Sequence, residues 1–222
     1  MARSFLAPLS RPAAVCLAIF GNAFTVGAVL MGFEMLGSRY LYPYFGGGIG
    51  TWAALISVVL LALAIGYFVG GSLASRANPL RTVGVLVAVA AIYLALVPLS
   101  ADAVMSWLLT RFDTLAVGQF AAALGLTLVP LSLLGTLSPV AVAALTRSAQ
   151  DSGVVAGWVY GVSTVGNILG VLLTTFVLVP TAGSRMITYM FAAVLAACAL
   201  TLILANRQLV TDQGGALAKA GT

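Results

Sequence analysis

Charged side chains are scarce in this chain of 222 residues, and the scarcity decides the class of protein. Only 7% of the residues are Asp, Glu, Lys or Arg, whereas 62% are hydrophobic. A water-soluble domain carries about a quarter charged residues. A soluble globular fold is therefore excluded, and an integral membrane protein is expected.

Residues that carry catalysis or bind metals are also few. The chain has no histidine, two cysteines and five acidic residues, which leaves little from which to build a transition-metal site. Cys16 and Cys198 lie in apolar runs, where thiols usually behave as small hydrophobic groups. No acid/base pair, no nucleophile with its base and no metal cluster can be recognised, so we expect no catalytic residue, no cofactor and no metal.

Six long stretches contain no charged residue at all. They run over 12–33, 40–75, 82–101, 114–146, 152–184 and 186–206. Each can cross a hydrocarbon core, which takes roughly 20 apolar residues in a helix, and the runs do not alternate as barrel strands do. We predict an all-α integral membrane protein with a cytoplasmic N-terminus (1–12), six transmembrane helices (13–206) and a flexible cytoplasmic C-terminal tail (207–222).

The first twenty residues, with a basic head and an apolar run, also fit a secretory signal peptide. Because the apolar run continues to Phe33, we expect this segment to be retained as the first helix.

Six crossings place both termini on one side, and the basic residues are divided unequally between the two sides. The side opposite the termini holds Arg39, Arg111 and Arg185. The side of the termini holds Arg3, Arg11, Arg76, Arg81, Arg147, Arg207 and Lys219. The positive-inside rule then predicts cytoplasmic termini in the inner membrane of a bacterium. The net charge of +5 indicates attraction to anionic lipid, because no soluble basic face is available to bind nucleic acid.

Two of the apolar segments are longer than a membrane requires. The runs 114–146 and 152–184 would each span about 50 Å as straight helices, against a core of roughly 30 Å. Bending, tilting or protrusion is expected, with Pro130 and Pro139 as bend points. Between Asp102 and Arg111, the segment AVMSWLLT is too short to span, and we predict a short amphipathic helix on the outer surface.

The stretch GFEMLGSRYLYPYFGGGIG, residues 32–50, places a carboxylate at the outer end of the first helix. Its proline and glycines predict a turn before a second helix that begins near Trp52, and its tyrosines fit an interfacial aromatic belt. Without a preceding strand, GGGIG is no nucleotide motif. Three roles stay open for Glu34: an ion pair with Arg39 or another outer arginine, binding of a cation, or a neutral hydrogen-bonded carboxyl group.

Polar side chains at bilayer depth tend to face a bundle interior or a water-filled cavity. In the fifth helix, Tyr160, Ser163, Asn167, Gly170 and Thr174 follow helical steps of three and four, so they share one stripe that could line a path or serve only in packing. The candidate polar pathway or interface comprises Asn22, Glu34, Arg39, Gln119, Tyr160, Ser163, Asn167 and Thr174.

A second pattern in the fifth helix is a glycine at every fourth position, formed by Gly153, Gly157 and Gly161. Such a repeat lets helix backbones approach closely, so we predict that these glycines pack against a neighbouring helix.

The outer turn and second helix carry a family resemblance. Their pattern is Glu34, then Arg39, a PYFG turn, Trp52 at the start of the second helix, and GYFVGGSLASR at its end. It resembles the bacterial proteins that join a major-facilitator-like membrane region to a spermidine-synthase-like domain. PLSLLGTLSPVAVAALTR and AGWVYGVSTVGNILGVLLTTFVLVPTAGSR are similar to the fourth and fifth helices of that family, whereas the third and sixth helices match weakly.

The resemblance implies a six-helix, major-facilitator-like half, without the soluble aminopropyltransferase domain and hence without its enzyme activity. We expect a membrane protein that binds or transports a small polar or cationic solute. Sites of such folds lie between two halves, so a homodimer or a partner subunit is also expected. The alternative is a non-catalytic structural or assembly subunit of a larger membrane complex. A membrane partner of a separately encoded synthase is the least favoured possibility.

Overall fold

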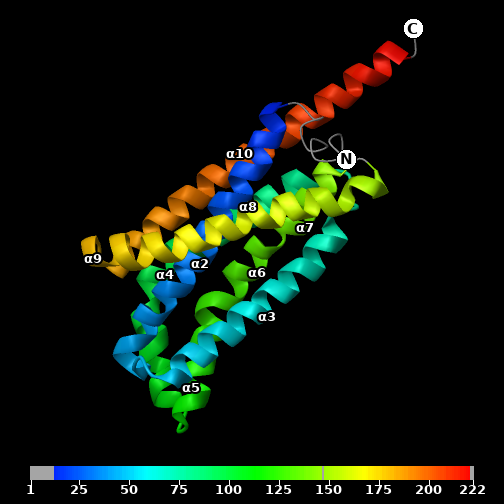
Figure 1. The fold of residues 1–222 in the computed structure, drawn as a ribbon. Helices are drawn as coiled ribbons and strands as arrows, with labels where there is room; N and C mark the ends of the chain where they lie inside the picture. Colours follow the sequence, from blue (N-terminus) through cyan, green and yellow to red (C-terminus); the bar gives the residue numbers. More distant parts are fainter. Residues whose placement is uncertain (1–12, 147, 221–222) are drawn as a thin grey trace.

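The computed structural model describes residues 13–146 and 148–220, with side chains as far as Arg207. The regular structure in these ranges is entirely helical, and six helical segments are long and apolar enough to cross a membrane. The predicted all-α class and the number of spans are therefore confirmed (Figure 1).

Four of the six segments are single helices. They are α2 (Ala13–Phe45), α3 (Ile49–Leu73), α4 (Pro79–Arg111) and α10 (Ser184–Ala220). The other two are composite. One joins α5 (Leu115–Ala123), the π-helical turn η2 (Leu124–Leu128), α6 (Val129–Gly135) and α7 (Leu137–Leu145). The other joins the 3-10 turn η3 (Ala149–Asp151), α8 (Ser152–Leu173), the π-helical turn η4 (Thr174–Leu178) and α9 (Val179–Thr181).

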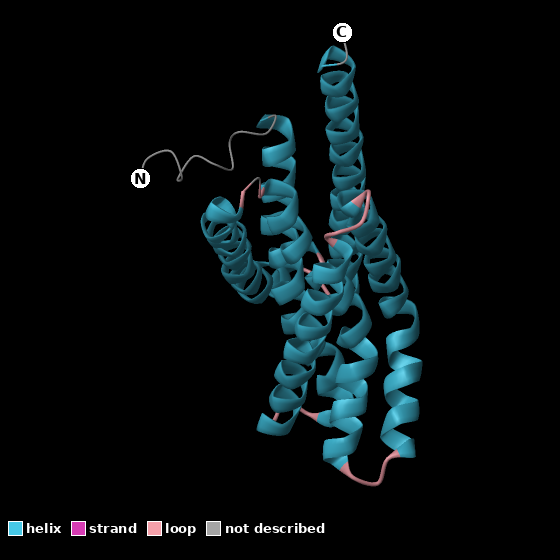
Figure 2. Cartoon of the chain, turned by 90° about the vertical axis from the view of Figure 1, so that its right-hand side faces the viewer, coloured by secondary structure: helices cyan, strands magenta, loops and turns pink. Residues whose placement is uncertain are grey.

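The helices associate mainly as three pairs. α2 packs along α8, α3 packs along the composite segment α5 to α7, and α4 packs along α10. The start of α2 and the end of α10 lie at the same end of the bundle, and α10 projects beyond it (Figures 1 and 2). α8 is the least covered span: only 17% of its most apolar window is buried, against 39–50% in the others.

α2 and α8 touch through their backbones. A Cβ atom added at Gly166 would lie 2.1 Å from the carbonyl oxygen of Phe24, and one at Gly170 would lie 2.1 Å from that of Ala28. Residue numbers rise together along both helices, so the pair is parallel. Only glycine permits this approach, and the seam fixes α8 on the bundle.

The three glycines of α8 predicted to pack against a neighbouring helix lie on a side of α8 that contacts no other helix that the structure describes. A Cβ atom at Gly153, Gly157 or Gly161 would meet no atom within 4 Å, because this face of α8 looks away from the bundle. Within the chain, packing is the role of Gly166 and Gly170. Packing of the other three glycines against a second molecule stays a prediction.

A similar seam joins α3 to α6. A Cβ atom at Gly66 would lie 2.5 Å from the carbonyl oxygen of Ser132, and one at Gly70 would lie 2.6 Å from that of Thr136. The two close contacts leave α3 and α6 parallel and bring Gly135 against the backbone of Gly66.

The expected interruptions of the long segments occur at prolines. The π-helical turns η2 and η4 end two residues before Pro130 and Pro180, and the break between α6 and α7 at Thr136 precedes Pro139. Proline lacks the amide hydrogen that would bond four residues back, so the preceding turn rearranges. The interruptions at Pro130 and Pro139 confirm the sequence-based expectation.

Two predicted boundaries, the end of the first helix and the start of the second, are wrong. α2 passes through Pro43 and ends only at Phe45, since a proline in the last turn removes one helical hydrogen bond at most. Gly46, at a φ of 73°, supplies the left-handed residue that ends the helix. The connection is reduced to residues 46–48, and the second helix begins at Ile49 rather than near Trp52.

The segment AVMSWLLT is no separate surface helix, because it forms the last turns of α4. A charge such as Asp102 marks the edge of the hydrocarbon but does not end a helix that packs on its neighbours. The expected flexible tail is also helical as far as Ala220, where α10 ends.

Candidate functional site

A small cavity lies where α2, α3, α8 and the joint between α6 and α7 meet. Its volume is about 30 Å³, enough for a water molecule or a group of similar size, which needs about 10–15 Å³. Most of the lining is apolar, and the polar side chains in it are Tyr67, Ser138, Ser163 and Asn167. The cavity thus brings together polar groups from three spans.

None of these four side chains makes a hydrogen bond with another residue that the structure describes, and the buried oxygen Oδ1 of Asn167 has no partner. Most polar groups in a protein interior are paired, because an unpaired one costs roughly 1–3 kcal/mol. At this cavity the argument applies to Oδ1 of Asn167, which is buried, whereas Tyr67 is 40% exposed.

The two polar residues of α8 reach the cavity because they lie one turn apart and face Gly27 of α2. A Cβ atom at Gly27 would lie 2.8 Å from Oδ1 of Asn167 and 2.6 Å from the backbone oxygen of Ser163. Gly27 therefore leaves room for the Asn167 amide. Two members of the predicted stripe, Ser163 and Asn167, therefore lie together at the cavity.

Tyr160, a third member of the stripe, is 42% exposed on α8. Its ring meets the ring of Tyr67 edge to face, with centroids 6.4 Å apart and an interplanar angle of 81°. The pair bridges α3 and α8 beside the cavity, so Tyr160 belongs to its surroundings rather than to its lining.

Glu34 is 7% exposed and makes no hydrogen bond or ion pair with a described residue. Arg39 is exposed and likewise has no ion pair among these residues. Neither the expected ion pair of Glu34 nor the hydrogen bond of a neutral carboxyl group is therefore found among the described residues, whereas cation binding stays open. Glu34 follows Gly27 by seven residues, so it lies on the cavity face of α2 about 10 Å nearer the C-terminal end of the helix at Phe45.

Two predicted candidates lie away from the cavity. Asn22 faces α10, and its Nδ2 donates to the hydroxyl of Thr201 at 2.8 Å. Thr174 is buried at the α2–α8 seam, where its Oγ1 would be 2.6 Å from a Cβ atom on Gly32.

Gln119, also predicted as a candidate, holds the outer turn instead. Its side-chain amide nitrogen, Nε2, donates to the carbonyl of Phe45 at 3.3 Å and to Oγ1 of Thr51 at 3.1 Å. Thr51 in turn donates to the carbonyl of Gly46 at 2.8 Å. Gln119 is thus a satisfied structural group between α5, α2 and α3.

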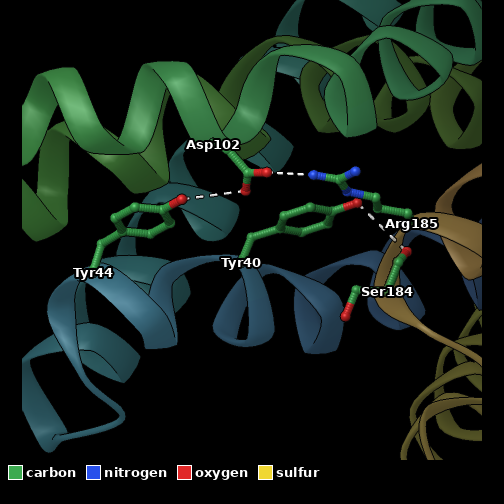
Figure 3. A network of polar contacts seen from close by, with 5 residues as sticks. All are labelled: Tyr40, Tyr44, Asp102, Ser184 and Arg185. Atoms are coloured by element: carbon green, nitrogen blue, oxygen red, sulfur yellow. Dashed lines mark hydrogen bonds and ion pairs between the residues drawn. The ribbon is translucent and has the colours of Figure 1, made fainter.

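Two tyrosines in the last turns of α2 do more than line a membrane interface (Figure 3). The hydroxyl of buried Tyr40 lies 2.9 Å from that of Thr188 and 3.4 Å from the carbonyl oxygen of Ser184, both on α10. One turn further out, Tyr44 donates to Asp102 of α4 at 3.2 Å. The aromatic-belt interpretation missed these links.

Asp102 also pairs with Arg185 at the start of α10, so one carboxylate joins three helices (Figure 3). The side chains of the pair are 62% and 65% exposed. The network links α2, α4 and α10 where α2 ends and α10 begins, and it is separate from the cavity.

Sequence reasoning also missed Tyr67 and Ser138 in the cavity. The available signal was that each is a polar residue inside an uncharged run, but such residues are common in the chain. Metal binding has no support among the described residues, since no group of three or more Cys, Asp or Glu side chains gathers there.

Comparison of the chain with protein-family models, with curated proteins and with solved structures finds no match. The fold and the cavity define a multi-pass membrane protein with a polar site within its helical bundle. The family resemblance of the sequence stays a hypothesis.

Proposed function

We propose that this chain is a six-helix, major-facilitator-like half of a membrane transporter for a small polar or cationic solute, one polar group of which is bound in the cavity. The observation that carries the proposal is the set of four polar side chains that line the cavity without partners. A transported solute must be bound by groups that are free to receive it and then released. Groups that already satisfied one another would not serve this purpose.

The chemistry of the lining favours a single polar group that can both donate and accept hydrogen bonds. Asn167 offers both an acceptor and a donor, and the hydroxyls of Ser138 and Ser163 can each do either. No charged residue lines the cavity itself. Glu34, on the same face of α2 toward the outer end, adds a carboxyl group that attracts a cation on its way to the cavity.

The open side of α8 fits the need for a second half. In such folds the site lies between two six-helix repeats, and here the side of α8 with Gly153, Gly157 and Gly161 is uncovered. A second copy of the chain or another membrane subunit would complete the site. We further propose a bacterial inner-membrane location with cytoplasmic termini, supported by the distribution of Lys and Arg, and assign the chain no enzymatic step.

Uptake by proteoliposomes tests the proposal. Purified full-length protein is reconstituted and supplied with labelled methylammonium, putrescine, urea or glycerol. We expect at least one of these probes to accumulate, and Asn167→Leu to remove most of that uptake. Thr164→Val is the matched control, because Thr164 is exposed on the same helix and donates to the carbonyl of Tyr160. Uptake of no probe, or equal uptake by both variants, would overturn the proposal.

A second candidate function is a structural subunit of a membrane complex, favoured by the low coverage of α8. Purification from the native membrane in mild detergent discriminates the two. If the same partner always copurifies, crosslinks to the uncovered side of α8, and no probe is taken up, the subunit role stands and the transporter role does not.

A further inference from the structure

Glu34 is an acidic side chain in the membrane-spanning part of α2. It lies eleven residues before the end of the helix at Phe45, about 16 Å along the axis. Because α2 is about 50 Å long, a hydrocarbon core of roughly 30 Å centred on it reaches to about 10 Å from each end. Glu34 is therefore at hydrocarbon depth, where an ionisable side chain is costly and usually serves a function.

The carboxyl oxygens of Glu34 lack a partner and yet can be reached. The residue is 7% exposed, and neither oxygen makes a hydrogen bond or an ion pair with a described residue. Within the described part of the chain, the unpartnered side-chain oxygens that are shut off from the surface are those of Asn22 and Asn167. The two oxygens of Glu34 are not among them, so each keeps some accessible surface through which a small ion can reach it.

The face of α2 that carries Glu34 packs on apolar side chains. Leu30, one turn earlier on this face, lines the polar cavity. Gly37, one turn later, lies against Leu55 of α3 and Leu126 of η2. Glu34 is thus placed between the cavity and a tightly packed part of the bundle.

No positive charge faces the carboxyl group. α3, the segment from α5 to α7, and α8 with η4 contain no charged residue, and their titratable groups are Tyr67 and Tyr160, at or beside the cavity. α4 and α10 meet α2 on other sides, where Asp102 and Arg185 pair with each other. Arg39, on α2 itself, is exposed. A carboxylate in these surroundings is too costly to stay bare, so the group takes up either a proton or a cation from outside the protein.

We propose that Glu34 is a proton-exchange site, which holds a proton when it is empty and gives that proton up when a cation binds. The inference rests on the proposed function and adds the ion that drives it. In the exchange the O–H bond of the carboxyl group breaks, the proton leaves to water, and the carboxylate pairs with the cation. Release of the cation reverses the step. Each cycle moves one proton against one monovalent cation, so no net charge crosses the membrane.

Proton release tests the exchange without transport. Full-length protein in detergent, with a pH indicator and little buffer, receives guanidinium chloride adjusted to the same pH. Guanidinium is the probe because it stays charged at every pH that the protein tolerates. We expect release of up to one proton per chain, and none from Glu34→Gln. Glu34→Asp keeps a carboxyl group and should restore the release, and Asp102→Asn is the control, since that carboxylate is exposed and already paired.

Proteoliposomes with an acidic lumen test the coupling. A difference of one pH unit should concentrate guanidinium about tenfold inside, because a one-for-one exchange stops when the two concentration ratios are equal. Glu34→Gln should abolish this accumulation. Glycerol carries no charge, and its uptake should be the same with and without the gradient in both proteins.

The outcomes separate this inference from the proposed function. Absence of proton release, equal release from Glu34→Gln, or guanidinium uptake that is indifferent to the pH gradient would each overturn the exchange. Uptake of glycerol or guanidinium in those cases would leave the proposed function standing. Uptake of no solute at all would refute the proposed function and the coupling with it.

Discussion

Gly170 of α8 lies directly against the backbone of Ala28 in α2, so closely that a Cβ atom on Gly170 would be 2.1 Å from the Ala28 carbonyl oxygen. With Gly166, placed in the same way against Phe24, this contact holds α8 on the bundle. It also sets the distance from Asn167 to the far wall of the cavity. The seam is therefore a condition for the site as well as for the fold.

We predict that Gly170→Ala lowers stability by about 1–3 kcal/mol, the usual cost of overpacking, because the backbone of Ala28 cannot move aside as a flexible side chain would. Thermal unfolding in detergent, followed by size-exclusion chromatography, measures the change. Gly161→Ala is the matched control on the same helix, where a Cβ atom meets nothing. It should be neutral or slightly stabilising, since alanine favours a helix by up to about 1 kcal/mol over glycine. Equal behaviour of the two variants would contradict the seam.

The glycines of α8 also show where sequence reasoning stops. Glycine pairs four residues apart occur in two registers, at Gly157 and Gly161 and again at Gly166 and Gly170. Both permit close packing, and only the position of α2 selects between them. The sequence predicted a close-packed fifth helix but not which of its sides is covered.

The same limit applies to polar residues. Hydrophobic length alone sufficed to predict six spans, because lipid requires it of every spanning helix. The stripe on α8 correctly grouped Ser163 with Asn167, since both belong to one helix. Whether Gln119 or Asn22 joins them depends on which neighbour each helix faces, and periodicity within one helix holds no such information.

At the outer end of the bundle, we predict that Tyr40→Phe lowers stability by about 1 kcal/mol, the typical net value of a buried hydrogen bond. The change removes the hydrogen bond between Tyr40 and Thr188, so the hydroxyl of Thr188 loses this partner. Tyr44→Phe should cost less, because its partner Asp102 is exposed to solvent. Unfolding midpoints of both variants and of Thr188→Val test the order. Fully additive effects of Tyr40→Phe and Thr188→Val would show that the two hydroxyls do not interact.

We expect Gln119→Leu to loosen the turn between α2 and α3. The variant leaves the carbonyl of Phe45 and the hydroxyl of Thr51 without the amide that joins them, at a cost of roughly 1–3 kcal/mol. Limited proteolysis within residues 46–48 should become faster. Phe120→Leu, at the exposed neighbouring position of α5, is the control and should be cut as slowly as the unchanged protein. Unchanged cleavage in Gln119→Leu would show that the turn does not depend on this amide.

The proposed orientation predicts which loops a membrane-impermeant maleimide reaches from outside intact cells. In a chain with Cys16→Ala and Cys198→Ala, we expect a cysteine at Gly47 to be labelled from outside. A cysteine at Ser75, in the exposed turn after α3, should be labelled only after the membrane is opened. The reverse result would place the termini outside and contradict the positive-inside argument.

The Glu34→Gln variant distinguishes a structural role of Glu34 from a functional one. Its carboxyl group is buried and has no partner among the described residues, so Glu34→Gln removes no ion pair and replaces the acid with a neutral group of similar size. Because burying an unpaired carboxylate is costly, stability should stay the same or rise. Asp102→Asn, which does break an ion pair, should lower stability by less than about 1 kcal/mol, since that pair is exposed.

Solute uptake should respond to Glu34→Gln in a different way from stability. If the carboxyl group of Glu34 attracts cations toward the cavity, Glu34→Gln should reduce the uptake of methylammonium or putrescine and leave that of glycerol unchanged, because the neutral amide attracts no charge. Uptake and unfolding midpoints measured on the same preparations decide between the roles. A fall in stability without a selective loss of cation uptake would mean that Glu34 only holds α2 in place, and the cationic part of the proposed function would then be withdrawn.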